Sequence, residues 1–187
     1  MRIGNPSELA LQYQANQTTA SRLLSIPHAQ LKLRKNNQWN AVDCIQHLIL
    51  TNTMLSRAMH EAVEARAAGN RASAPFFSFS LPAWMESWML KQIEPPVRFK
   101  FKAPAVISPD SGIAEQSPKE ILDAYVASHA PLLALLQKPI EQLERVRFIH
   151  PARSMNLSVI AGLSTIAAHD RRHLWQAERS VGMGREL

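Results

Sequence analysis

Hydrophobic residues recur every three or four positions along four separate stretches of this chain, with polar residues between them. The clearest stretch begins near residue 41 and fades near Gly69. Its apolar positions fall on one stripe of a helix: Ile45, Leu48, Leu55, Met59 and Ala62. No run of alternating Val, Ile and Thr is comparably strong. Four amphipathic helices whose apolar faces need partners predict an all-α fold, a four-helix bundle.

Local capping sequences predict where three of these helices begin. Residues 5–8 and 117–120 each place a capping side chain before a proline, with a glutamate three positions after the cap. Such a glutamate satisfies amide groups that the first helical turn leaves free. Residues 40–43 repeat the pattern with aspartate. We therefore expect helices to begin near residues 6, 41 and 118.

The remaining helix boundaries rest on proline and glycine. The first helix should end before Pro27. The fourth is predicted from about Asn156 to Gly182, because glycine suits the end of a helix. Pro131 falls inside the third helix and is expected to kink it near His129.

A long proline-rich connection, residues 70–116, separates the second helix from the third. Its prolines are Pro75, Pro82, Pro95, Pro96, Pro104 and Pro109. Such a length is typical of a crossover or a functional lid, and it lets the two helices run parallel. A short helix is predicted over 82–92, with four large apolar side chains on one side: Trp84, Met85, Trp88 and Met89. We interpret these four as core packing rather than as the lining of a ligand pocket.

Residues 97–102 alternate strictly between apolar and basic. In an extended chain, Phe99 and Phe101 would share one face, opposite three cations: Arg98, Lys100 and Lys102. The favoured interpretation is that both rings pack on the bundle while the charges stay in water. The alternative is that rings and cations together grip a single-stranded nucleic acid.

Composition narrows the class of protein. The chain has 187 residues, 46% of them hydrophobic, which suits a single domain over 1–187. The N-terminus lacks the apolar core of a signal peptide, and no apolar run approaches the ~20 residues that cross a bilayer. The one cysteine, Cys44, cannot form an intramolecular disulfide, so we expect a cytoplasmic protein. The net charge of +6 is scattered, as on an ordinary solvated surface.

Three histidines carry the candidate chemistry. His169 and His173 lie four positions apart, so on a helix their imidazoles project from one face. The other positions on that face are uncharged, as are those that share a face with His47. Two inward faces could bring three imidazoles together inside the bundle, where metal sites are commonly built. Hydrogen-bonded or exposed histidines would explain the same spacing.

Two of these segments resemble motifs of a known family. The run 39–48, a tryptophan followed some eight residues later by His-Leu, resembles the second-helix motif of the DinB/YfiT-like superfamily. The run 168–177, two histidines four apart followed by a glutamine, resembles the closing motif of that superfamily. Lys102-Ala-Pro104, the capped third helix and His150-Pro151 recur in the same order, so the resemblance covers nearly the whole chain.

The resemblance implies an up-down-down-up bundle in which three residues hold a divalent metal, here matching His47, His169 and His173. Members of the superfamily catalyse transfer and isomerisation reactions that use low-molecular-weight thiols, or metal-dependent hydrolysis. Homodimers are frequent among them. We therefore expect a thiol-dependent S-transferase or a hydrolase that acts on a small molecule. Zinc is the first choice of metal, and nickel, iron and manganese also accept imidazole.

Other residues of the last helix are weaker catalytic candidates. Asp170 takes the place of glutamate in the metalloprotease His-Glu-x-x-His pattern and could act as a general base. A solvated or metal-supporting carboxylate is favoured. Gln176 could line the pocket as a neutral hydrogen-bonding group. Arg172 could hold an anionic substrate, although an exposed side chain is favoured.

Further residues have plain structural explanations. Cys44 could join the metal, but burial as a small hydrophobe is favoured. Asp43 could orient the ring of His47 or complete the helix cap. His129 is expected to bond a carbonyl that Pro131 frees. The remaining histidines have no ligand spacing, and we assign them no role: His28, His60 and His150.

Two classes of function remain open. The first is a metal-dependent enzyme with a small-molecule substrate and no membrane or nucleic-acid partner. The second is a non-catalytic, stress-associated binding module whose metal is structural or absent, and whose basic surface contacts nucleic acid. Metal content and its dependence on the three histidines separate the two classes most directly.

Overall fold

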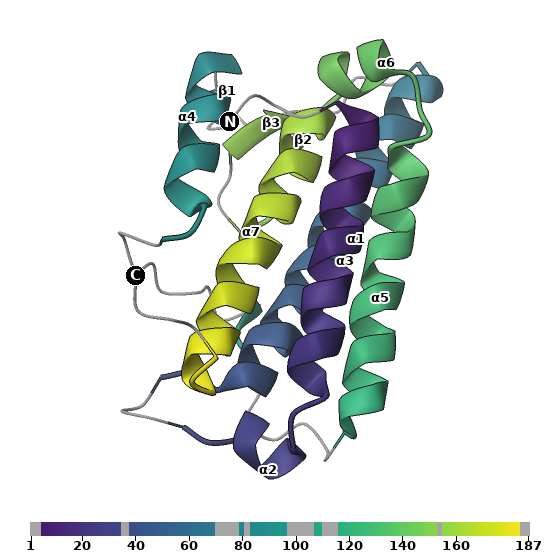
Figure 1. The fold of residues 1–187 in the computed structure, drawn as a ribbon. Helices are drawn as coiled ribbons and strands as arrows, with labels where there is room; N and C mark the ends of the chain where they lie inside the picture. Colours follow the sequence, from purple (N-terminus) through teal and green to yellow (C-terminus); the bar gives the residue numbers. More distant parts are fainter. Residues whose placement is uncertain are drawn as a thin grey trace.

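The computed structural model describes residues 5–34, 38–69, 79–80, 83–96, 107–109, 116–152 and 155–183. Four long helices dominate it: α1 (Pro6–Leu24), α3 (Ala41–Ala67), α5 (Pro118–Leu135) and α7 (Val159–Ser180). Three shorter helices join them: α2 (His28–Leu31), α4 (Ala83–Ile93) and α6 (Ile140–Arg145). The predicted all-α helical bundle is confirmed (Figure 1).

In the bundle, the first two long helices, α1 and α3, pack mainly against the other two long helices and not against each other. α3 packs against α7 and α5, and α1 packs against the same two helices. In Figure 1, α1 and α7 run toward the end of the bundle that carries α2, whereas α3 and α5 run the opposite way. The segment between α3 and α5 therefore crosses over to connect two parallel helices.

Capping explains why three helices begin where the sequence predicts. The Asn5 side chain accepts a hydrogen bond from the Glu8 amide at 2.8 Å, and Pro6 opens α1. Asn40 and Ser117 each complete a reciprocal capping box at the start of α3 and α5. These side chains satisfy amides that would otherwise lack partners in the first turn.

The last helix begins later than predicted. Asn156 lies in a strand opposite Ile149, and Arg147 holds it there by donating to its carbonyl oxygen at 2.6 Å. The cap is instead Ser158, whose hydroxyl accepts from the Ala161 amide at 3.2 Å. Strand pairing therefore displaced the helix start to Val159.

Helix ends follow the proline and glycine signals in part. α1 ends at Leu24, before Pro27. α7 ends at Ser180, and Gly182 just after it has a positive φ of 80°. The amide of Met183 bonds the carbonyl of Glu178 at 2.9 Å, the pattern of a glycine-terminated helix. α5 is assigned as one continuous helix through Pro131.

A small sheet covers one end of the bundle, and the sequence did not predict it. Its strands are β1 (Phe79–Ser80), β2 (Arg147–Ile149) and β3 (Met155–Ser158), in the order β1-β3-β2. β1 pairs parallel to β3, and β2 pairs antiparallel to it. Strands of two to four residues are too short for alternation to reveal. The sheet ties the crossover to the start of α7.

Glu86 strengthens this tie. It stands on α4 and is 4% exposed, and its carboxylate accepts from both the amide and the hydroxyl of Ser158 at 3.2 Å. Arg147 lies 3.3 Å from the same carboxylate. The crossover helix is therefore fastened directly to the cap of α7.

The prediction that the tryptophans of the crossover helix are core residues was wrong. Trp84 and Trp88 are 68% and 55% exposed, whereas Met85 packs against the core. Because α4 packs along α7 with one face, its other face remains outside the bundle. The alternating segment 97–102, including Arg98, Lys100 and Lys102, lies outside the described residues.

The bundle interior combines apolar packing with specific polar contacts. The predicted stripe of α3, including Ile45 and Leu48, is buried. Tyr13 of α1 donates to the carbonyl of Leu163 on α7 at 2.8 Å. Gly162 lets Phe148 approach closely, since an added Cβ would lie 2.5 Å from that ring. None of the described helices has the length and apolar content that a bilayer-spanning segment needs.

Candidate metal centre

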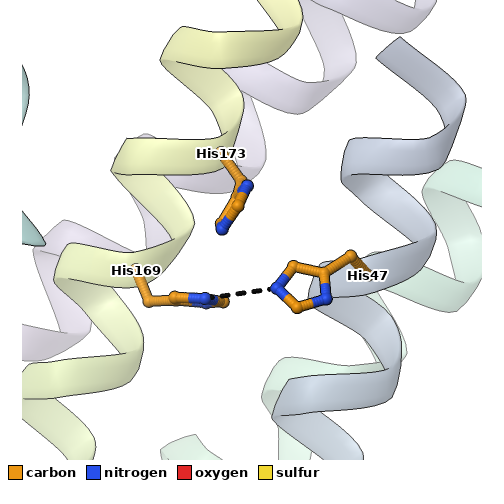
Figure 2. Close-up of side chains that lie close together, drawn as sticks. All are labelled: His47, His169 and His173. Carbon is orange, nitrogen blue, oxygen red and sulfur yellow. Dashed lines mark hydrogen bonds between the residues drawn. The ribbon is translucent and has the colours of Figure 1, made fainter. Parts of the chain in front are cut away.

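The three predicted histidines converge between two helices. His47 stands on α3, and His169 and His173 stand one turn apart on α7, with all three rings directed toward one another (Figure 2). The Nε2 atoms of His47 and His169 are 3.3 Å apart, and one nitrogen from each ring lies within 4.8 Å of the others. The predicted inward faces therefore meet.

The hydrogen bond of His47 fixes which of its nitrogens is free. Its Nδ1 lies 2.6 Å from the carbonyl oxygen of Ile107, which belongs to the crossover. A carbonyl can only accept, so Nδ1 carries the proton and donates. Nε2 is left with a lone pair directed at His169, the arrangement that a carbonyl partner typically gives a metal-binding histidine.

Burial keeps the three imidazoles neutral. It lowers the pKa of His173 from 6.5 to about 3, with smaller contributions from the nearby charges of His47 and Arg172. The pKa of His169 also lies well below 6.5, first through burial and then through its two histidine neighbours. Burial lowers the pKa of His47 too, against an opposing effect of its bond to Ile107. Neutral imidazole is the form that binds metal ions.

The donor set fits a divalent cation. Nitrogens bound to a tetrahedral zinc at ~2.0–2.1 Å lie roughly 3.4 Å apart, close to the His47–His169 separation of 3.3 Å. The buried Nδ1 atoms of His169 and His173 have no hydrogen-bond partner among the described residues. Three histidine ligands would leave one coordination position of the cation open for water or substrate.

Trp39 forms one wall of this centre. Its ring centroid lies 4.9 Å from that of His47 and 5.9 Å from that of His173. Trp39 also packs against the apolar cluster that contains Cys44. Its contact with the histidine rings could not be read from spacing alone.

Asp170 lies in the bundle interior, so of the two favoured alternatives, a solvated or a metal-supporting carboxylate, the solvated one was wrong. It is fully buried, and its Oδ2 accepts from the Tyr125 hydroxyl at 2.8 Å and from His129 Nε2 at 2.7 Å. Neither partner belongs to the histidine cluster. No described contact places this carboxylate in the position of a general base for that cluster.

His129 therefore has a different partner from the one predicted. Instead of bonding a carbonyl freed by Pro131, it links Asp170 to Gln17, whose side-chain nitrogen lies 3.0 Å from His129 Nδ1. Asn52 also contacts Asp170, at 3.5 Å. The network could not be predicted from the sequence, because its members come from four helices and no local spacing relates one helix to another.

Of the remaining candidate residues, Arg172 and Gln176 lie close to the histidine cluster, whereas Asp43 has a structural role. Arg172 is 9% exposed, so the prediction of an exposed side chain was wrong, and it is near enough to lower the pKa of His169 and His173. Gln176 follows His173 by three positions on α7, and its side chain partly offsets the low pKa of that ring. Asp43 completes the cap of α3 and pairs with Arg34.

Cys44 is buried as predicted, and burial raises the pKa of its thiol. Among the described residues, the other histidines do not belong to the group whose nitrogens converge. His60 lies within α3 and bonds the carbonyl of Pro131, and His150 Nδ1 accepts from the Ala152 amide at 3.2 Å. His28 begins α2.

Comparison with known proteins identifies the family. A family model described as the DinB superfamily matches residues 12–177, a range that includes all three histidines. The chain belongs to the DinB superfamily. No curated protein and no solved structure gives a significant match. The resemblance seen in the two histidine motifs is therefore confirmed at the level of the superfamily.

Proposed function

We propose that this member of the DinB superfamily is a divalent-metal-dependent enzyme whose cation is held by His47, His169 and His173. The observation that carries the proposal is the convergence of three imidazoles, two of them with Nε2 atoms 3.3 Å apart. Membership of the family supports it. Zinc is the first choice of ion, because three neutral nitrogen ligands and an open position suit it.

The chemistry we propose is transfer to or from a low-molecular-weight thiol, or hydrolysis of a small molecule. Bound at the three histidines, a divalent cation would supply Lewis acidity, which makes a thiol or water nucleophilic near neutral pH. The chain itself contributes the orientation of the ligands. The Ile107 carbonyl keeps the proton of His47 on Nδ1, and Trp39 covers one side of the cluster.

Two further side chains would act on the substrate. Arg172 is buried beside the cluster, and its guanidinium would hold an anionic group of the substrate, such as the carboxylate of a thiol. We expect Arg172→Met to raise KM for an anionic substrate more than it lowers kcat. Gln176, three positions after His173 on α7, would line the pocket with a neutral hydrogen-bonding group.

The first experiment measures metal content in protein purified without a histidine tag. We expect about one equivalent of a divalent ion, lost in His47→Ala and in His173→Ala. His60→Ala is the matched control, because His60 stands on the same helix as His47 but bonds a carbonyl of α5. Metal retained in both ligand variants would refute the proposed centre.

The second experiment tests catalysis on the metal-loaded protein. Turnover is measured with a panel of low-molecular-weight thiols paired with electrophiles, and separately with hydrolysable small molecules. Activity that disappears in His173→Ala but remains in His60→Ala supports the enzyme. Stoichiometric metal with no turnover across both panels would favour the binding-module alternative.

A further inference from the structure

We propose that Ile107 is a positioning residue of the metal centre. Its buried side chain anchors the stretch of the crossover whose carbonyl orients the ring of His47, and in this way Ile107 raises the affinity of the three histidines for a divalent cation. The inference rests on the proposed function, because it concerns the same cation. It assigns a role to a residue that stands on neither of the helices that carry the ligands.

A hydrogen bond joins the crossover directly to one ligand. The carbonyl oxygen of Ile107 lies 2.6 Å from Nδ1 of His47, a residue 60 positions earlier in the chain. The backbone of α3 fixes one end of the histidine side chain and the carbonyl fixes its ring, so Nε2 stays directed at His169 (Figure 2). A half-turn of the ring would put a carbon against the carbonyl and turn Nε2 away from His169. The bond therefore holds the ring orientation that suits a shared cation.

The other two ligands are positioned in a different way. His169 and His173 stand one turn apart on α7, so that helix itself sets their spacing. Their buried Nδ1 atoms have no hydrogen-bond partner among the described residues. His47 comes from α3, so its place relative to the pair depends on the packing of two helices and on its bond to Ile107. Of the three rings, His47 therefore has the most to lose when the crossover moves.

The side chain of Ile107 keeps this carbonyl in place. It is 6% exposed, within the short described stretch 107–109 of the crossover. A β-branched side chain has few rotamers, so a buried isoleucine also restrains the backbone that carries it. Hydrogen bonds weaken steeply when their geometry is disturbed, and truncation of a buried side chain lets nearby groups relax into the space. Shortening Ile107 should therefore loosen the carbonyl without removing it.

The test compares the affinity of metal-free variants for zinc by competition with a chromophoric chelator. We expect Ile107→Ala to weaken binding by about ten- to a hundredfold, the range typical of groups that orient a metal ligand. Ile107→Val keeps the branch and most of the volume, so it should bind almost as tightly as the wild type. Leu90→Ala is the matched control, because Leu90 is 1% exposed on α4 of the same crossover and its carbonyl accepts from the Glu94 amide. Its affinity for zinc should not change.

Nitrogen chemical shifts of His47 in metal-free protein give a readout that a general loss of stability would not move. We expect the proton on Nδ1 in the wild type, in Ile107→Val and in Leu90→Ala. In Ile107→Ala the carbonyl holds the ring less firmly, so part of the population should carry the proton on Nε2 instead. A wild-type ring with its proton on Nε2, or a tautomer that Ile107→Ala leaves unchanged, would overturn the positioning role.

The outcomes separate this inference from the proposed function. Wild-type protein that binds zinc while Ile107→Ala binds equally well would overturn the role of Ile107 and leave the metal centre intact. An equal loss in Leu90→Ala would also overturn it, because the effect would then follow the general stability of the crossover. Wild-type protein that binds no divalent ion would overturn the proposed centre and this inference together.

Discussion

The indole of Trp39 lies against the imidazole of His47, with their ring centroids 4.9 Å apart. Trp39 immediately precedes the cap of α3, and His47 lies two turns into that helix. The same indole lies near His173, so one aromatic ring contacts ligands from two helices. Its fluorescence should therefore report events at the centre.

We predict that cobalt binding quenches Trp39. Cobalt(II) accepts imidazole ligands and quenches indoles within contact distance, so tryptophan emission should fall in proportion to occupancy. Emission is followed during titration of metal-free protein. Trp39→Phe should remove most of the quenching, although three other tryptophans remain. Equal quenching with and without Trp39 would contradict this arrangement.

The low pKa of His173 predicts a loss of stability in acid. In metal-free protein its pKa is about 3, against 6.5 for an ordinary histidine. Below pH 6.5 the unfolded chain therefore binds a proton that the folded chain does not, so the free energy of unfolding falls as the pH falls toward 3. The slope from this one group approaches ~1.4 kcal/mol per pH unit.

The measurement is urea unfolding between pH 7 and pH 5 in the presence of a chelator. His173→Gln should flatten the dependence on pH, because this substitution removes the titrating group. An unchanged slope in His173→Gln would show that the ring titrates normally in the folded protein.

Gly162→Ala should destabilise the protein by about 1–3 kcal/mol, as overpacking of a filled core typically does. The added methyl would lie 2.5 Å from the Phe148 ring and 2.9 Å from the Met59 sulfur. Urea unfolding measures the change. Combining Gly162→Ala with Phe148→Leu should cost less than the sum of the two separate losses, because the smaller side chain makes room. Strict additivity would argue against the close approach.

Glu86→Ala should lower the free energy of unfolding by about 2–4 kcal/mol, because it leaves buried donors without their acceptor. The buried donors are the amide and the hydroxyl of Ser158, and the guanidinium of Arg147 would lose one of its partners. Glu61→Ala is the control, since Glu61 is 62% exposed and pairs with Arg57 of the same helix, α3. Equal effects of the two substitutions would contradict the fastening role of Glu86.

Local signals were sufficient to predict most of the scaffold. Capping side chains at Asn5, Asn40 and Ser117 fix helix starts because they act within three residues of the chain. The start of α7 was misplaced because strand pairing, which depends on Ile149 and Asn156 meeting, overrode the local signal. Strands of a few residues leave no periodicity to find.

The same difference between local and long-range contacts decides which residues of the site could be predicted. His169 and His173 were predicted from helical spacing, and His47 from its uncharged face and the family motif. The partners of Asp170 could not be predicted, because His129 and Tyr125 lie more than forty positions away in sequence. The burial of Arg172 likewise depends on which groups surround α7, and a single helical pattern does not contain that information.

The His47–His169 contact joins positions 122 residues apart. A ribosome that has released α3 and α5 has therefore presented only one of the three imidazoles, because the other two stand on α7. Contacts of such long range form late in folding. A nascent chain or a fragment that stops before α7 has a single ligand, so the three-histidine site can form only after α7 has joined the bundle.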